Sequence, residues 1–235
     1  MARVSAELIS RHFGTWEHPY RSFEKLVDSN LGRGATLVDV GCGRTAPVLR
    51  KYSGKGLTLI GIDCVEFSEA IPGIELHNAD ICRSGLGDEV ANVVMARSVM
   101  EHVREPEHAL SEIRRILKPS GCFIFLTANR WDYASMLARL VPNRLHPWLV
   151  RATEGREEED VFPTAYRCNS RGQISSLAQK AGFEIRSFEY LGQYPNYLLF
   201  NRWAFLAGTA YEKAIARYES LHWLRGWLLV CLQKK

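Results

Sequence analysis

The sequence lacks any apolar run of the roughly 18–20 residues that a membrane-spanning helix needs. It also lacks a block of lysine and arginine, and its net charge is only +4. Proteins that bind nucleic acid usually carry a clustered basic patch, so no nucleic-acid partner is expected. Residues 1–20 do not contain the apolar core of a secretory signal peptide, which predicts a cytoplasmic protein.

The six cysteines include no Cys-x-x-Cys pair, the spacing that is typical of structural zinc sites. Several of them lie inside apolar runs, where a thiol behaves as a small hydrophobic group. The sequence therefore predicts no metal site and a reducing compartment. Hydrophobic residues make up 46% of the chain and charged residues 24%, as in an ordinary globular protein with a real core.

Short apolar runs alternate with amphipathic segments along most of the chain. Strands are expected at 36–40, 57–63, 74–80, 90–96, 122–128, 183–191 and 226–235, and helices at 46–52, 106–119 and 169–183. Strands that alternate with helices form right-handed βαβ units, and nearly continuous apolar strands indicate a buried, mostly parallel sheet. The sequence thus predicts an α/β fold in a single domain over 1–235.

Two segments depart from this alternation. Residues 129–168 carry three prolines and the acidic run EGREEED, and residues 194–225 are rich in aromatic side chains and are expected to be helical. Arg202, Lys213 and Arg217 make the second segment too polar to span a membrane. It could instead lie on a membrane surface, form a homodimer interface, cover a hydrophobic substrate, or pack on the sheet.

The stretch TLVDVGCGRTAPVL (36–49) predicts a strand, a tight turn and a helix. Gly41, Gly43 and Ala46 fit the loose dinucleotide-binding pattern G-x-G-x-x-G/A. Asp63 follows 20 positions after Gly43 (63 − 43), where an acid that binds ribose is expected. Taken alone, this pattern predicts a nucleotide-containing ligand without saying which one.

Asp39 separates the alternatives, because it places a carboxylate two positions before the first glycine. A pyrophosphate at a helix N-terminus is attracted by amide groups and the helix dipole, and a nearby carboxylate opposes it. S-adenosylmethionine instead presents an ammonium and a sulfonium group, and its ribose would suit Asp63. An NAD(P)-dependent oxidoreductase is the alternative, although no Tyr-x-x-x-Lys pair for hydride transfer is present.

The motifs VDVGCGRT, GID, NAD, VVMARSVMEHV and ILKPSG follow one another between residues 36 and 128. Together they resemble the class I S-adenosylmethionine-dependent methyltransferases that act on small molecules, and GWLLVCLQKK resembles the last strand of that family. Residues 129–190 resemble a bacterial branch from polysaccharide and natural-product clusters. The resemblance implies a Rossmann-like fold, with a mostly parallel seven-stranded sheet, helices on both faces, and helical insertions after strands five and six.

The resemblance also implies which residues bind S-adenosylmethionine. They are Asp39, Gly41, Cys42, Gly43, Asp63, Asp80, Ile81, Arg97 and Ser98. The glycine turn would pass under the methionine part and Asp63 would bind the ribose hydroxyls. Asp80 would accept a hydrogen bond from the adenine amino group, with Ile81 beside the ring, while Arg97 and Ser98 would face the methionine end.

Plainer alternatives exist for these side chains. Asp39 could cap the following helix, and Asp63 could be an ordinary carboxylate at the end of a strand. Asp80 could simply belong to a turn. Arg97 and Glu101 could pair with each other.

His102 lies just after the fourth strand and is the candidate general base, because a hydroxyl acceptor often needs a base that titrates near neutral pH. It could also be structural. Candidate acceptor-binding residues are His12, Trp16, Tyr20, Asn129, Arg130, Tyr133, Tyr166 and Arg167. Such donors and aromatic groups suit a sugar or another hydroxylated molecule. Residues 1–34 are expected to form a lid over the cofactor-binding core at 35–128.

The sequence therefore predicts a cytoplasmic S-adenosylmethionine-dependent methyltransferase that O-methylates a small hydroxylated molecule. A non-catalytic cofactor-binding module, which uses 194–225 to bind a partner or membrane, is the alternative from another class. Nucleic-acid methylation is disfavoured because the sequence has neither an Asn/Asp-Pro-Pro-aromatic signature nor a Pro-Cys nucleophile.

Overall fold

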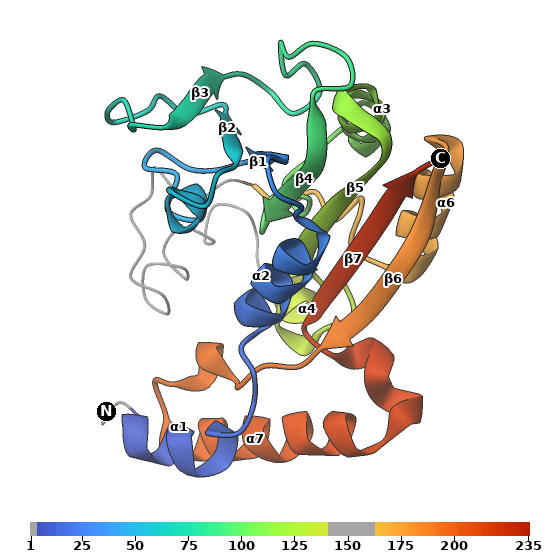
Figure 1. Ribbon diagram of the computed structural model, residues 1–235. Coiled ribbons are helices and arrows are strands. Elements are labelled where there is room, and N and C mark those ends of the chain that lie inside the picture. Colours follow the sequence, from blue (N-terminus) through green and yellow to red (C-terminus); the bar gives the residue numbers. More distant parts are fainter. Residues whose placement is uncertain (1–3, 141–162) are drawn as a thin grey trace. The chain divides into compact units, whose positions relative to one another are not determined.

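The computed structural model describes residues 4–140 and 163–235 and divides into two compact units (Figure 1). The sheet unit comprises residues 20–127, 165–189 and 229–235, and the helical unit comprises the described residues within 1–19, 128–164 and 190–228. Part of the expected insertion at 129–168, including the acidic run, lies outside the described residues. Within the described ranges, no helix is long and apolar enough to cross a membrane.

Seven strands form one sheet in the order β3-β2-β1-β4-β5-β7-β6. They are β1 (Thr36–Val40), β2 (Thr58–Asp63), β3 (Ile74–Asn78), β4 (Ala91–Arg97), β5 (Leu117–Ala128), β6 (Phe183–Leu191) and β7 (Trp227–Lys234). The first five pair in parallel, and the arrow of β7 points against that of β6 in Figure 1. This confirms the prediction of an α/β fold with a mostly parallel seven-stranded sheet.

The strands at the centre of the sheet are buried on both faces. In β1, neighbouring Leu37 and Val38 point to opposite faces, and both have no exposed surface. β5 is less regular than expected: Leu117 pairs with Ala91, and pairing then resumes between Cys122 and Val93. Residues 118–121 are therefore an irregularity within the strand.

The helices agree only partly with the sequence. They are α1 (Ala6–Phe13), α2 (Pro19–Asn30), α3 (Pro106–Ile116), α4 (Tyr133–Leu140), α6 (Arg171–Lys180) and α7 (Arg202–Arg217). The expected helix at 46–52 is only a short 3-10 turn, Leu49–Tyr52, and similar turns occur at Asn196–Leu198 and Glu219–Leu224. Ser170 caps α6 as predicted, because its hydroxyl accepts a hydrogen bond from the amide of Gln173.

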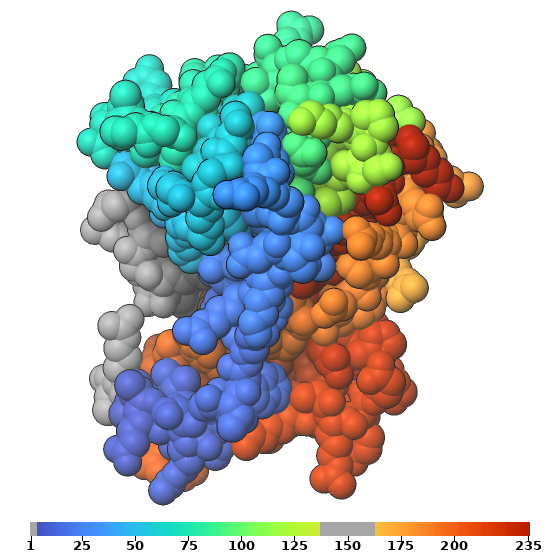
Figure 2. Space-filling model, viewed as in Figure 1, coloured from blue at the N-terminus to red at the C-terminus, as the bar shows by residue number. Residues whose placement is uncertain are grey.

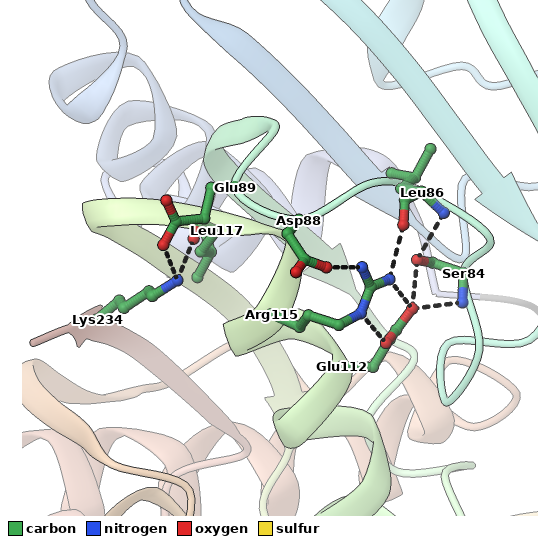
Figure 3. A network of polar contacts seen from close by, with 8 residues as sticks. All are labelled: Ser84, Leu86, Asp88, Glu89, Glu112, Arg115, Leu117 and Lys234. Atoms are coloured by element: carbon green, nitrogen blue, oxygen red, sulfur yellow. Dashed lines mark hydrogen bonds and ion pairs between the residues drawn. The ribbon is translucent and has the colours of Figure 1, made fainter.

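Two crossovers contain no helix, 64–73 between β2 and β3 and 79–90 between β3 and β4. A polar network fixes the second crossover to α3 (Figure 3). Arg115 donates hydrogen bonds to the carboxylate of Glu112 and to the Leu86 carbonyl, and Glu112 accepts from Ser84. The guanidinium lowers the pKa of Glu112 to about 2. Charge-assisted bonds thus hold a segment that has no helix of its own.

The helical unit has an aromatic core. Phe13 of α1 packs edge-on against Trp16, with ring centroids 4.9 Å apart, and its ring lies 6.2 Å from those of Tyr194 and of Phe205 on α7. Phe13 and Trp16 also line a cavity of about 310 Å³. The aromatic residues of the terminal segment therefore join α1 to α7 within this unit.

Two carboxyl groups are buried in the helical unit. Asp132 precedes α4 and accepts a hydrogen bond from the amide of Ala134, and burial raises its pKa to about 6. Glu212 on α7 is only 1% exposed, and its Oε2 has no hydrogen-bond partner among the described residues. Burial, with a smaller contribution from Asp132, raises the pKa of Glu212 to about 8.

We expect Glu212 to make stability depend on pH. Its folded-state pKa of about 8 exceeds the ordinary value of 4.5, so its contribution to stability is lost as pH rises from 4.5 through 8. Glu212→Gln should remove that loss. The difference in the free energy of unfolding between the variant and wild type should therefore be about 2–4 kcal/mol more in favour of the variant at pH 8.5 than at pH 5.5. Urea unfolding at the two pH values measures this. The exposed Glu219, changed to Gln, is the control, and equal shifts at both pH values would contradict the assignment.

Candidate functional site

The turn after β1 is attached to the end of β2. The amides of Gly41 and Cys42 donate to the carbonyl of Ile62 at 2.8 and 3.2 Å. The amide of Gly43 donates to Oδ2 of Asp63 at 2.7 Å. Three successive amides therefore bind the carboxyl end of the neighbouring strand, which is the edge where open α/β sheets bind ligands.

Gly41 adopts a φ of 73°, and Gly43 a φ of 76°. A Cβ on Gly41 would lie 2.2 Å from Cγ2 of Val99, which leaves no room for a side chain. The thiol of Cys42 is buried and packs on Gly61, where a Cβ would lie 2.8 Å from the sulfur. The predicted turn is therefore present, with the Cys42 side chain directed into the core.

Asp39 is buried at the carboxyl end of β1, with 2% of its surface exposed. Its Oδ2 has no hydrogen-bond partner within the described residues. Burial raises its pKa to about 8, against a smaller opposing effect of Arg97. The helix-cap alternative is wrong, because Val48 precedes the Leu49–Tyr52 turn and no side chain caps it.

Both carboxylate oxygens of Asp63 accept hydrogen bonds from backbone amides. Besides Gly43, the amide of Val65 donates to Oδ1 at 3.1 Å, and the side chain is almost buried. Each carboxylate oxygen has two lone pairs, so the carboxylate can accept further hydrogen bonds. Asp63 is thus both a support of the turn and a candidate ligand-binding group.

The residues after β3 lie beside Asp63. The amide of Ala79 donates to the Asp63 carbonyl at 2.9 Å. Asp80 is exposed, and its Oδ1 accepts from the amide of Cys82 at 2.7 Å, which is ordinary turn geometry. Ile81 is half-buried. The structure brings Asp80 and Ile81 to the predicted edge, while their adenine-binding roles stay predictions.

Arg97, at the end of β4, contacts the second helix. Its guanidinium carbon lies 4.4 Å from the ring centroid of Tyr20, and its Nη1 lies 3.5 Å from Oε1 of Glu24. The Tyr20 hydroxyl is 3.5 Å from Oγ of Ser98, which has an unusual φ of 58° for a residue other than glycine. Arg97, Ser98 and Tyr20, expected on the cofactor and acceptor sides, therefore form one cluster.

Glu101 belongs to a buried network that the sequence did not reveal. Thr127 at the end of β5 donates to Oε2 of Glu101 at 2.8 Å, and Asn169 donates to Thr127 at 2.9 Å. All three residues are buried. Their only sequence signal is that polar residues follow apolar runs, which also describes an ordinary loop. The network connects the loops after β4 and β5 to the start of α6.

His102 lies half-buried in the loop after β4, between two attachment points. The amide of Tyr166 donates to the carbonyl of Glu101 at 3.2 Å. The guanidinium of Arg167 donates to the carbonyl of Arg104 at 2.8 Å. The structure therefore places the predicted base and two predicted acceptor residues on adjoining loops of the sheet unit.

The other predicted acceptor residues belong to the helical unit. His12 contacts Lys213, with Nδ1 and Nζ 3.4 Å apart. The ring of Tyr133 lies edge-on to that of Tyr211, with centroids 5.4 Å apart, and the guanidinium carbon of Arg130 lies 5.3 Å from the centroid of Trp131. Their roles toward an acceptor stay predictions, as does that of Trp16.

Asn129 is a correction to the expected acceptor set. It is fully buried, and its side-chain amide donates to the carbonyls of Trp223 and Arg225 at 2.7 and 2.8 Å. Its side-chain oxygen accepts from the amide of Trp131. With its polar atoms used on backbone groups, Asn129 joins two loops of the helical unit and has no side-chain donor left for an acceptor.

A groove of about 720 Å³ lies elsewhere on the sheet unit, near the start of β4. Its lining includes Glu107 and Glu112 on α3, Lys180 on α6, and Lys234 at the end of β7. It is remote from the glycine turn, which follows the opposite ends of the parallel strands. The turn is therefore the better candidate for the cofactor site.

Comparisons with known proteins show the family of the chain. A family model described as a methyltransferase domain matches residues 15–187. The chain is 27% identical over 192 residues to a ubiquinone biosynthesis O-methyltransferase from Maricaulis maris (strain MCS10), covering 77% of this chain and 67% of that protein. It is 29% identical over 131 residues to the protein of the same name from Pseudomonas putida (strain W619), covering 51% of this chain and 56% of that protein.

A solved structure has a similar fold. The geranyl diphosphate C-methyltransferase from Streptomyces coelicolor A3(2), in complex with Mg²⁺, geranyl diphosphate and S-adenosyl-L-homocysteine, matches with a TM-score of 0.60. It is 14% identical, and the match covers 92% of this chain and 80% of that one. The family model includes the glycine turn, Asp63 and the loop after β4. The chain belongs to the S-adenosylmethionine-dependent methyltransferase family.

Proposed function

We propose that this protein transfers a methyl group from S-adenosylmethionine to a hydroxyl group of a small molecule. The observation that carries the proposal is a buried carboxylate oxygen of Asp39, which has no hydrogen-bond partner among the residues that the structure describes. A buried carboxylate is costly unless a cation or hydrogen-bond donor reaches it, and the ammonium group of the cofactor supplies both. A pyrophosphate at the same place would add a second negative charge, which argues against NAD(P).

The chain's own residues would hold the cofactor at three points. Asp39 would accept from the ammonium group, directly or through water, while Gly41 and Gly43 allow the backbone to approach closely. Asp63 would accept from the ribose hydroxyls, and Asp80 would lie toward the adenine. When bound, S-adenosylmethionine supplies the electrophilic methyl carbon and its leaving group. The protein then has to align the acceptor and exclude water.

His102 would take the acceptor proton. Neutral imidazole can accept a proton from a hydroxyl group as its oxygen attacks, and the adjoining loops carry Tyr166 and Arg167 to orient polar groups. The relatives named as O-methyltransferases support oxygen as the methylated atom. A sugar or a natural product with several hydroxyl groups is the acceptor class that these donors favour.

An acceptor panel tests the proposal. The purified protein would be incubated with S-adenosylmethionine and a panel of hydroxylated sugars and phenols. Each acceptor would be paired with a control compound in which its hydroxyl groups are already methylated. We expect formation of S-adenosylhomocysteine with at least one hydroxylated compound and none with its methylated counterpart. Turnover only with amines, or equal turnover with both members of a pair, would contradict O-methylation.

Asp39 predicts a pH dependence of cofactor binding. With a pKa of about 8 it is mostly protonated at pH 6.5, and it must lose that proton to pair with an ammonium group. The affinity for S-adenosylhomocysteine should therefore rise roughly 5- to 10-fold between pH 6.5 and 7.5. Titration calorimetry at the two pH values measures this rise. Asp39→Asn should bind S-adenosylhomocysteine weakly, and its affinity should not rise between these pH values. A wild-type affinity that does not change with pH would contradict the role.

A further inference from the structure

The exposed face of α7 combines large aromatic and basic side chains. Trp203 is 77% exposed and Phe200, just before the helix, is 53% exposed. The other exposed residues of this face are Arg202, Ala207, Ala210, Lys213, Ala216 and Arg217. Figure 2 shows the α7 segment, in orange-red, at the surface of the molecule beside α1. Exposed apolar surface that is contiguous and rimmed by polar residues marks interaction sites, whereas a single exposed hydrophobic side chain does not.

All the exposed charges on α7 are positive. The helix contains three basic residues, Arg202, Lys213 and Arg217, and one acid, Glu212, which is buried. Lys213 also contacts His12 of α1. The partner of this face must therefore accept a tryptophan ring and at the same time complement a positive charge.

We propose that the exposed face of α7 docks on an anionic lipid surface. Tryptophan and phenylalanine insert readily at the boundary between headgroups and acyl chains. Lysine and arginine can extend from such a helix to negatively charged headgroups. Stacking two copies of this face would instead bring like charges together, so charge complementarity favours the lipid surface over a homodimer.

Vesicle co-sedimentation of the full chain tests the proposal. The vesicles would contain phosphatidylcholine alone, or phosphatidylcholine with about 30% of the anionic lipid phosphatidylglycerol. We expect binding to the anionic vesicles, weaker binding to the neutral ones, and release from the anionic ones at high salt. Trp203→Ala should lower the partition coefficient at least about 10-fold, and the double variant Lys213→Glu/Arg217→Glu should reduce it further.

Trp223→Ala is the matched control. Trp223 is also exposed in the helical unit, at 43%, but its ring packs against Trp131 and it lies outside α7. This variant should bind vesicles as wild type does. Circular dichroism would verify that each variant is folded.

Three results would overturn the proposal. The first is equal binding of wild type to neutral and anionic vesicles, and the second is unchanged binding of folded Trp203→Ala. The third is a stable dimer, detected by light scattering, that Trp203→Ala converts to a monomer and that does not bind vesicles. In that last case the α7 face would be a contact between copies of this chain.

Discussion

Replacing Asp63 with alanine is expected to weaken the binding of S-adenosylhomocysteine by ~10- to 100-fold. The carboxylate holds the Gly43 amide at 2.7 Å and the Val65 amide at 3.1 Å, and it would also accept from the ribose. Removing it leaves the ribose hydroxyl groups of the bound ligand without an acceptor, at a cost of roughly 1–3 kcal/mol. That cost corresponds to the expected change in affinity, which titration calorimetry measures directly.

An asparagine at the same position separates support of the turn from contact with the ligand. Asp63→Asn keeps one oxygen that can accept from Gly43, so the turn should survive and the variant should melt near the wild-type temperature. It loses the negative charge and an acceptor, so cofactor affinity should still fall. If both variants bind S-adenosylhomocysteine as wild type does, Asp63 supports the turn only and the ribose is held elsewhere.

Replacing His102 with alanine is expected to lower kcat by about 100-fold, the low end of what general bases contribute. Binding of S-adenosylhomocysteine should stay within a factor of about two, because His102 is not among the residues assigned to the cofactor. Single-turnover measurements with the acceptor found in the panel give the rate of methyl transfer. The pH dependence of this rate should lose the fall at low pH that protonation of a general base produces.

The matched control for this variant is His108→Ala. His108 is exposed on α3, six positions along the chain (108 − 102), and its Nδ1 lies 3.4 Å from Oε2 of Glu105. Its removal should leave kcat unchanged. Wild-type turnover in His102→Ala would mean that His102 is structural and that the reaction needs only alignment of the acceptor.

The strands were predictable because their signal is local. Runs such as TLVDV bury alternate side chains on both faces of a parallel sheet, so hydrophobicity marks each strand directly. The glycine turn was predictable for the same reason, since Gly41 and Gly43 need backbone angles that other residues avoid. Only a short 3-10 turn forms where a helix was predicted at 46–52, because an amphipathic pattern of seven residues does not fix the length of a helix.

The long-range contacts could not be read from the sequence. Thr127 and Asn169 are 42 positions apart and meet only because β5 and α6 are neighbours in the fold. Asn129 was predicted to bind the acceptor because it follows a strand. Its side-chain amide instead donates to carbonyls 94 and 96 residues away along the chain. Glu212 carried no signal, because an acid on a helix is normally solvated and its burial depends on packing within the helical unit.

The most direct test of the cofactor assignment is a thermal-shift titration with S-adenosylhomocysteine, NADH and NADPH in parallel. A ligand at ~100 times its dissociation constant should add about 2.7 kcal/mol to the free energy of unfolding, which raises the melting temperature measurably. We expect a rise with S-adenosylhomocysteine alone, and a smaller rise in Asp63→Ala. A rise with NADH or NADPH alone would contradict the role of Asp39 and, with it, the proposed methyl transfer.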